Sequence, residues 1–391
     1  MATNDFTLEV TLKQHTPIIH FQHEQEGATL RATEVKPKLD RFLIEKKGGW
    51  EHISNDWKVG GGMEGQRALR YKLSFQTLSS NPEPKEVEII PPDKRKTLKA
   101  SSIKLFIFSF NKEIVKLIRQ SIDEFFSVHN FGLRQNKGWG GFIPDNIQNT
   151  DQYEGLMVSS GYTIYKYDGM VNSGDFYFPL MRNIWQVLKS GQNHKEYKKS
   201  LLFKYAANKG IRWEKRAIKK ALFAKIESGE LPMDLISNND PVDVLKGEKG
   251  CETNTKAYFS WINNPEFSYD YRFIRLLLGM PEHYEYRAYG NYIYQVKPKS
   301  LNGIERFKAP ITFKVFQRNL YAIVEKEPFP KGLLKESNEF SFSVQKKVNN
   351  NKDGNEIDLD LNLKLPSSFD LTEFLDEYFK CVGFSKLTKH G

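Results

Sequence analysis

The sequence predicts a mixed α+β fold, and three observations carry this prediction. Apolar and polar residues alternate in Phe6–Leu12 and again in Leu69–Phe75, which is the period of a half-buried strand. Ile114–Phe126 repeats its apolar residues every three or four positions, as an amphipathic helix does. Segments of the two kinds follow one another along the chain, which favours neither an all-helical nor an all-strand protein.

The first half of the chain predicts its elements in order. After Phe6–Leu12, a helix is expected within Leu30–Lys46, starting near Glu34 because Pro37 fits only the first turn of a helix. The strand Leu69–Phe75 follows. Proline and charge between residues 81 and 99 then indicate a long exposed loop.

A second strand–helix pair comes next. Ser102–Phe110 is apolar on both faces, as in a central strand buried on both sides, and Asn111 is suited to cap the helix that follows. A glycine-rich loop, residues 131–142, comes after that helix. One more strand after the loop would complete a βαββαβ unit of the ferredoxin-like type.

The second half of the chain is less regular but still mixes helices and strands. Its expected elements are helices in Ser173–Lys189 and Lys195–Glu227, a hairpin of Arg306–Val315 and Asn319–Glu325, strands in Glu339–Lys346 and Ile357–Leu365, and a closing helix in Phe369–Val382. We therefore predict two ferredoxin-like lobes, the second elaborated by helical insertions. The predicted division is residues 1–165 and 166–391.

Composition limits the classes of partner. The 391 residues carry a formal net charge of +10, which favours a polyanionic partner. The two cysteines, Cys251 and Cys381, form neither a disulfide framework nor a zinc cluster, so a reducing cytoplasm is expected and no metal or cofactor is predicted. No apolar run reaches the roughly 18 residues of a spanning helix, so no membrane role is expected.

The excess charge is concentrated in one segment. Residues 189–227 contain twelve Lys and Arg against three acidic residues, a net charge of +9. This run predicts a contact with a polyanion such as RNA, although docking on an acidic subunit or a merely solvated face would give the same pattern. The residues that we expect to contact RNA here are Lys215, Arg216, Lys219 and Lys220.

The glycine-rich loop is the strongest candidate site. Glycine lets a backbone approach phosphate closely, and basic side chains add charge-assisted contacts. An exposed tryptophan could stack on a base. An ordinary turn between helix and strand is the alternative. The candidate RNA-binding residues are Gly132, Arg134, Gln135, Asn136, Lys137, Gly138, Trp139 and Gly140.

The start of the first helix is a further candidate. Arg31, Lys36 and Lys38 surround a helix N-terminus, where backbone N–H groups favour anions. A solvated basic turn would have the same sequence.

Three stretches give the chain a resemblance to the RAMP superfamily of CRISPR-associated proteins. Within that superfamily it resembles the first subunits of the Cmr module of type III-B systems. The resemblance is carried by Thr16-Pro17 with Leu30–Lys36, by Gly132–Gly140, and by Leu278-Gly279-Met280-Pro281 with Arg306–Ile311.

The resemblance implies a non-catalytic subunit near one end of a type III effector ribonucleoprotein. Its partners would be guide RNA, target RNA and other CRISPR effector subunits, and no residue would be catalytic. The rival interpretation is a metal-independent endoribonuclease that processes guide precursors, with His15, His20 or His23 as acid and base. A third interpretation is a pure protein–protein adaptor.

Overall fold

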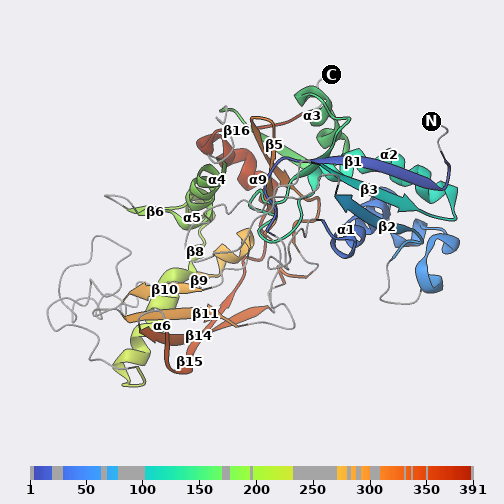
Figure 1. Cartoon of the computed structure of the whole chain (residues 1–391). Coiled ribbons are helices and arrows are strands. Elements are labelled where there is room, and N and C mark those ends of the chain that lie inside the picture. Colours follow the sequence, from blue (N-terminus) through green and yellow to red (C-terminus); the bar gives the residue numbers. More distant parts are fainter. Residues whose placement is uncertain are drawn as a thin grey trace. The chain divides into compact units, whose positions relative to one another are not determined.

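The computed structural model divides the chain into two compact units (Figure 1). Unit 1 contains residues 1–182, 311–326 and 383–391, and unit 2 contains residues 183–310 and 327–382. The structure describes residues 4–19, 30–62, 68–77, 102–169, 177–193, 197–231, 271–279, 283–287, 292–299, 309–329, 332–335, 338–348 and 351–388. Several predictions lie outside them, including the loop 81–99, His20, His23 and the part of the hairpin before Ala309.

The first sheet belongs to unit 1 and has the strand order β2-β3-β1-β4. All neighbouring strands in it are antiparallel. The element order along the chain is β1-α1-β2-β3-α2-β4, so the predicted βαββαβ order is present, including the strand after the glycine-rich loop. The strands are β1 (Thr7–Gln14), β2 (Lys72–Thr77), β3 (Ser102–Phe108) and β4 (Phe142–Pro144).

Two helices accompany this sheet. α1 (Ala32–Lys46) begins before the predicted Glu34 and holds Pro37 in its interior, so the expected start was wrong by two residues. α2 (Lys112–Val128) is capped as predicted, because the Asn111 side chain accepts from the backbone N–H groups of Glu113 and Ile114. Between α1 and β2 the chain forms the 3-10 turns Trp50–His52, Asn55–Trp57 and Val59–Gly62.

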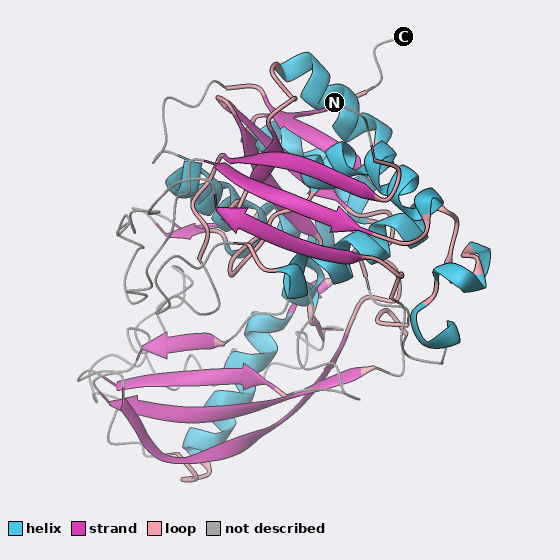
Figure 2. Ribbon diagram, turned by 45° about the vertical axis from the view of Figure 1, so that its right-hand side comes forward, coloured by secondary structure: helices cyan, strands magenta, loops and turns pink. Residues whose placement is uncertain are grey.

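The described helices α1 and α2 pack on one face of the first sheet, and Figure 2 shows β1, β3 and β2 side by side with helices on their far side. The core face carries Leu12, Ile103, Leu105 and Ile107, which pack with the apolar residues of α1 and α2. Along β3, buried and half-exposed residues alternate. The prediction that this strand is central is confirmed by the strand order, but its burial on both faces was wrong.

A second four-stranded sheet in unit 1 has the order β12-β13-β5-β16. Ranked along the chain, these are the second, third, first and fourth strands, the same arrangement as in the first sheet. Along the chain, α4 (Tyr177–Trp185) follows the first of these strands, while α9 (Leu371–Tyr378), which belongs to unit 2, precedes the fourth. The strands are β5 (Thr163–Tyr167), β12 (Ile311–Phe316), β13 (Asn319–Val324) and β16 (Phe384–Lys386), and α3 (Thr150–Ser159) precedes them.

Unit 2 holds a six-stranded sheet of order β10-β11-β14-β15-β9-β8, with α6 along one face (Figure 2). The predicted strands near residues 339 and 357 are confirmed, and so is the capped closing helix, in which the Asp370 side chain accepts from Glu373 N. The strands are β8 (Arg212–Trp213), β9 (Tyr271–Arg272), β10 (Tyr284–Arg287), β11 (Tyr292–Pro298), β14 (Glu339–Val348) and β15 (Asn351–Lys364).

The helical prediction for Lys195–Glu227 is confirmed over α5 and α6 and wrong over two short strands, β7 and β8. Among the described residues this stretch contains β7 (Tyr197–Lys198), α5 (Leu201–Asn208), β8 and α6 (Glu214–Glu227). Gly210, with φ of +74°, ends the first helix, because a left-handed residue interrupts helical hydrogen bonding. Before residue 195, a π-helical turn (Gln186–Ser190) extends α4. The short strand β6 (Gln192–Asn193) pairs with β7.

Within the described ranges, no helix combines the length and the apolar character needed to cross a membrane.

Candidate nucleic-acid interface

The glycine-rich loop joins α2 to β4 and is bonded to the segment that follows β1. Leu133 N donates to Ile19 O over 2.8 Å, and Gly140 N donates to Pro17 O over the same distance. Within the loop, Phe131 N donates to Gly140 O over 3.0 Å. The loop is therefore held at both ends by backbone hydrogen bonds, with its middle residues at the surface of unit 1.

The loop glycines are required by close contacts inside the protein. Gly140 has φ of +70°, and a Cβ atom there would lie 1.8 Å from Phe131 O. At Gly138 a Cβ atom would meet only the flexible end of the Met181 side chain, so there glycine is favoured by its φ of +82°. Glycine at these positions thus serves the fold itself, whether or not the backbone also approaches a phosphate.

The structure brings together two of the predicted site segments, the glycine-rich loop and the start of α1. The Lys38 ammonium donates to Gln135 Oε1 over 2.6 Å and to Asn130 O over 3.0 Å. Glu34 accepts from the same ammonium and, over 2.7 Å, from Gly132 N. The sequence interpretation missed Glu34, and its position in the first turn of α1 is the one local signal for such a role.

Asn130 ties the loop to the second sheet of unit 1. Its side-chain amide donates to Gln135 O over 2.8 Å and to Phe313 O over 2.7 Å. Phe313 N donates in turn to Asn136 O over 3.1 Å. The loop backbone at Gln135 and Asn136 is therefore fixed against β12.

Lys314 on β12 lies beneath this network with its side chain fully buried. Its ammonium donates to His129 O and, over 3.2 Å, to Asn130 Oδ1. Burial lowers the pKa of Lys314 well below its usual value, and the nearby Lys38 charge lowers it further. A single lysine within an apolar strand is normally expected at the surface. The local sequence therefore gave no signal that Lys314 is buried.

Lys36 is turned toward the protein. Its ammonium pairs with Asp40 at 2.8 Å, donates to Leu69 O over 2.9 Å and lies 4.1 Å from the centre of the Tyr71 ring. Burial raises the pKa of Asp40, and the Lys36 charge opposes that rise. Lys36 and Lys38 therefore both have protein partners in this structure.

The remaining predicted basic residues differ in exposure. Arg31 occupies the N-cap position of α1 in an extended conformation and is half-buried. Arg134 is half-buried with φ of +56°, a conformation that is uncommon for a non-glycine residue. Lys137 is exposed, and its backbone forms a bridge with Phe313.

Trp139 was expected to be exposed, and that expectation is wrong. The side chain is 5% exposed, and its ring stacks on Phe178 with 3.9 Å between ring centres and 14° between planes. Ile19, Leu133 and Phe178 form a small apolar cluster around it. In this conformation its ring faces are covered by protein, because a large apolar side chain next to other apolar residues gains more from burial than from exposure.

The basic run lies in unit 2. α6 buries Ala217, Ile218 and Leu222 together with the carboxylate of Glu214. Lys215, Arg216 and Lys219 are half-buried and Lys220 is exposed. Trp213, which the sequence placed among these charges, is buried and contacts the Phe203 ring.

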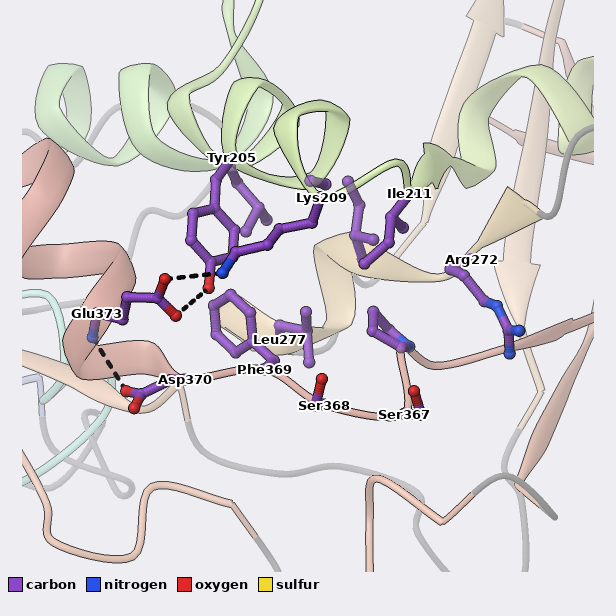
Figure 3. Close-up of a pocket in the computed structure, with 14 residues that line it drawn as sticks. Tyr205, Lys209, Ile211, Arg272, Leu277, Ser367, Ser368, Phe369, Asp370 and Glu373 are labelled. Atoms are coloured by element: carbon purple, nitrogen blue, oxygen red, sulfur yellow. Dashed lines mark hydrogen bonds and ion pairs between the residues drawn. The ribbon is translucent and has the colours of Figure 1, made fainter.

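A pocket of about 450 Å³ in unit 2 was not predicted (Figure 3). Its apolar wall includes Tyr205 and Phe369, and Glu373 accepts from Tyr205 Oη over 2.9 Å and from Lys209 Nζ over 2.8 Å. Arg272 lines another part of the pocket and donates to Leu365 O over 3.3 Å. The charged groups at this pocket thus have protein partners.

Leu278 and Gly279, from the third stretch that carries the resemblance, have a structural role in unit 2. Lys189 donates to the carbonyls of Leu278 and, over 2.5 Å, Gly279, at the end of a 3-10 helix (Ile274–Leu278). A Cβ atom at Gly279 would lie 3.0 Å from that of Ala309. Two parts of the third resembling stretch therefore pack against each other.

The histidines of the rival interpretation are only partly described. His15 is half-buried and its ring lies 5.2 Å from that of Phe316. Among the described residues, no group of three or more His, Cys, Asp or Glu could hold a metal ion.

Comparison with known proteins assigns the chain to a family. A model of the Cmr1 N-terminal domain matches residues 5–192, and a model of the Cmr1 C-terminal domain matches residues 197–388. The crystal structure of Cmr1 from Pyrococcus furiosus in its apo form is similar at a TM-score of 0.39 and 11% identity, covering 98% of each chain. No curated protein matches. Because the two domain models cover nearly the whole chain in their natural order, the chain belongs to the Cmr1 family and is a subunit of a type III-B CRISPR effector complex of the Cmr type.

Proposed function

We propose that this subunit binds RNA without cleaving it, and that it positions guide RNA and target RNA near one end of the effector complex. One observation carries the proposal. The glycine-rich loop and the start of α1 are joined through Lys38, Gln135 and Glu34 into a single surface. Arg31, Arg134 and Lys137 lie on the segments that form it.

The described contacts give four of the predicted residues a role inside unit 1. Lys36, Lys38, Gln135 and Trp139 hold the surface in place, since each has a close partner within unit 1. Arg134 and Lys137, from the middle of the loop, supply the charge that attracts phosphate. Specificity is left to base pairing between the RNA strands, which an electrostatic surface does not read.

The strand orders support the proposed architecture. Both four-stranded sheets of unit 1 have the strand arrangement second, third, first, fourth, and in each case a helix follows the first strand along the chain. This is the arrangement of a ferredoxin-like lobe, so we propose two such lobes, the six-stranded sheet of unit 2 being an insertion in the second. A boundary near residue 165 and a cytoplasmic location remain proposals from the sequence.

The basic face of α6 is proposed as a second contact in the assembled particle. Its residues Lys215, Arg216, Lys219 and Lys220 belong to the most charged segment of the chain. The face would contact RNA or an acidic neighbouring subunit.

A salt series of single-stranded RNA binding tests the proposal. If each basic residue of the loop neutralises one phosphate, the variant Arg134→Ala/Lys137→Ala flattens the slope of log affinity against log salt by about 1.4. A matched control, Lys112→Ala/Lys116→Ala, removes two exposed lysines from the first half of α2. It changes the net charge equally and leaves the slope unchanged. A folded loop variant with the slope of the unaltered chain would show that the clamp lies elsewhere.

A further inference from the structure

The face of the first sheet that the helices leave open carries a row of aromatic rings. Phe106, Phe108 and Phe110 stand at alternate positions along β3 and just beyond it, so their side chains point to the same side. Phe106 and Phe108 are half-exposed, and Phe110 is 89% exposed. The rings of Phe108 and Phe110 meet edge to face, with 4.8 Å between their centres. Two half-exposed rings and one exposed ring on one face of a folded domain indicate an interaction surface.

The strand register identifies what surrounds the rings. Directly opposite residues of an antiparallel pair share one face, and Phe108 lies opposite Lys72 of β2 while Phe106 lies opposite Ser74 of β2 and Glu9 of β1. Gln76 and Lys104 form the next opposite pair. Along the described strands β1, β2 and β3, this face has aromatic, basic and uncharged polar side chains, one acidic side chain (Glu9) and no aliphatic one.

The charge of this face is positive. Lys13, Lys72 and Lys104 stand against one acid, Glu9. Lys104 pairs with Glu9 at 3.3 Å and its ammonium lies 5.6 Å from the centre of the Phe106 ring. Lysine and serine are depleted in the buried centres of protein–protein interfaces, whereas rings beside cations are the usual platform for single-stranded nucleic acid.

We propose that this surface, the ring face of β3, is a second binding site for single-stranded RNA. Phe106 and Phe108 each stack on one base, since side chains two residues apart on a strand are separated by roughly 7 Å. Lys72 and Lys104 contact the phosphates on either side. The inference rests on the proposed function of RNA binding, but it assigns that binding to a sheet face that the glycine-rich loop does not include.

Removing the rings is the first part of the test. Anisotropy of a fluorescein-labelled oligouridylate is measured with the full chain and with Phe106→Ala/Phe108→Ala. The expected loss of affinity is about 5- to 150-fold for each stack removed, with the salt slope unchanged because stacking is not ionic. The matched control Phe106→Tyr/Phe108→Tyr keeps the rings and keeps the affinity. Circular dichroism verifies that each variant is folded.

Changing the charges is the second part. Lys72→Ala/Lys104→Ala flattens the salt slope by about 1.4 if each lysine neutralises one phosphate. Glu9→Gln raises affinity, because it removes an anion that faces the phosphates. The stacking variant and the charge variants therefore give different signatures at the same site.

The loop variant Arg134→Ala/Lys137→Ala, measured in parallel, separates this inference from the proposed function. If the loop variant loses affinity while Phe106→Ala/Phe108→Ala binds like the unaltered chain, the ring face is not an RNA site and the proposed function stands. If that ring variant binds RNA normally but no longer enters the assembled effector, the face docks a protein subunit, and the inference is equally overturned. If the unaltered chain binds no RNA, both proposals fail.

Discussion

At the scale of single residues, Lys314 is an amine enclosed by the protein. Its partners are the oxygen atoms of His129 and Asn130, and no carboxylate is among the causes of its altered pKa. A buried amine favours its neutral form, so the folded pKa lies well below the value of the unfolded chain, about 10.4. Between these two pKa values the unfolded chain binds more protons, and stability therefore rises with pH through that window.

This sign gives a test with Lys314→Met. The variant lacks the titrating amine, so the free energy of unfolding of the unaltered chain should increase relative to that of the variant as pH rises toward about 10. Chemical denaturation at a series of pH values measures the difference. Lys116→Met, at an exposed site on α2, is the control and should show no such trend. A difference that is independent of pH would mean that Lys314 stays protonated when folded.

At the scale of elements, the glycine-rich loop and α4 are joined by the stack of Trp139 on Phe178. We expect Trp139→Ala to destabilise the fold by about 3–5 kcal/mol, because it empties a packed site. Phe178→Ala and the double variant complete a cycle whose coupling energy should be about 0.5–1.5 kcal/mol. Denaturant unfolding measures all four proteins. Unchanged stability of Trp139→Ala together with weakened RNA binding would instead assign the ring to base stacking.

At the scale of the whole molecule, the proposed function predicts that the purified chain does not cleave RNA. Repeat-containing RNA incubated with the protein should remain intact in EDTA and in the presence of Mg²⁺ or Mn²⁺. His15, the one described histidine of the rival interpretation, packs its ring beside Phe316. Specific cleavage that disappears in His15→Ala, His20→Ala or His23→Ala would establish the endoribonuclease instead.

The sequence by itself determined the local elements of the first sheet and its helices and the position of the glycine-rich loop, but not α3 or β5 of unit 1. The alternation in β1, the amphipathic period of α2 and the Asn111 cap each depend on residues close together in the chain. The same local rules failed where one residue changes the outcome. Gly210, with its left-handed backbone, divides the basic run into two helices. The apolar period of the surrounding residues carries no information about the backbone conformation of this one residue.

Only the tertiary structure decided which side chains have partners and which remain at the surface. Lys314 meets Asn130 from 184 positions away, and Lys38 meets Gln135 from 97 positions away. Trp139 is buried by Phe178 on another element, whereas β3, apolar on both faces in sequence, has one buried face and one half-exposed face. Periodicity reports the spacing of side chains within an element. Burial and pKa depend on the elements packed against it, and those are chosen by the fold as a whole.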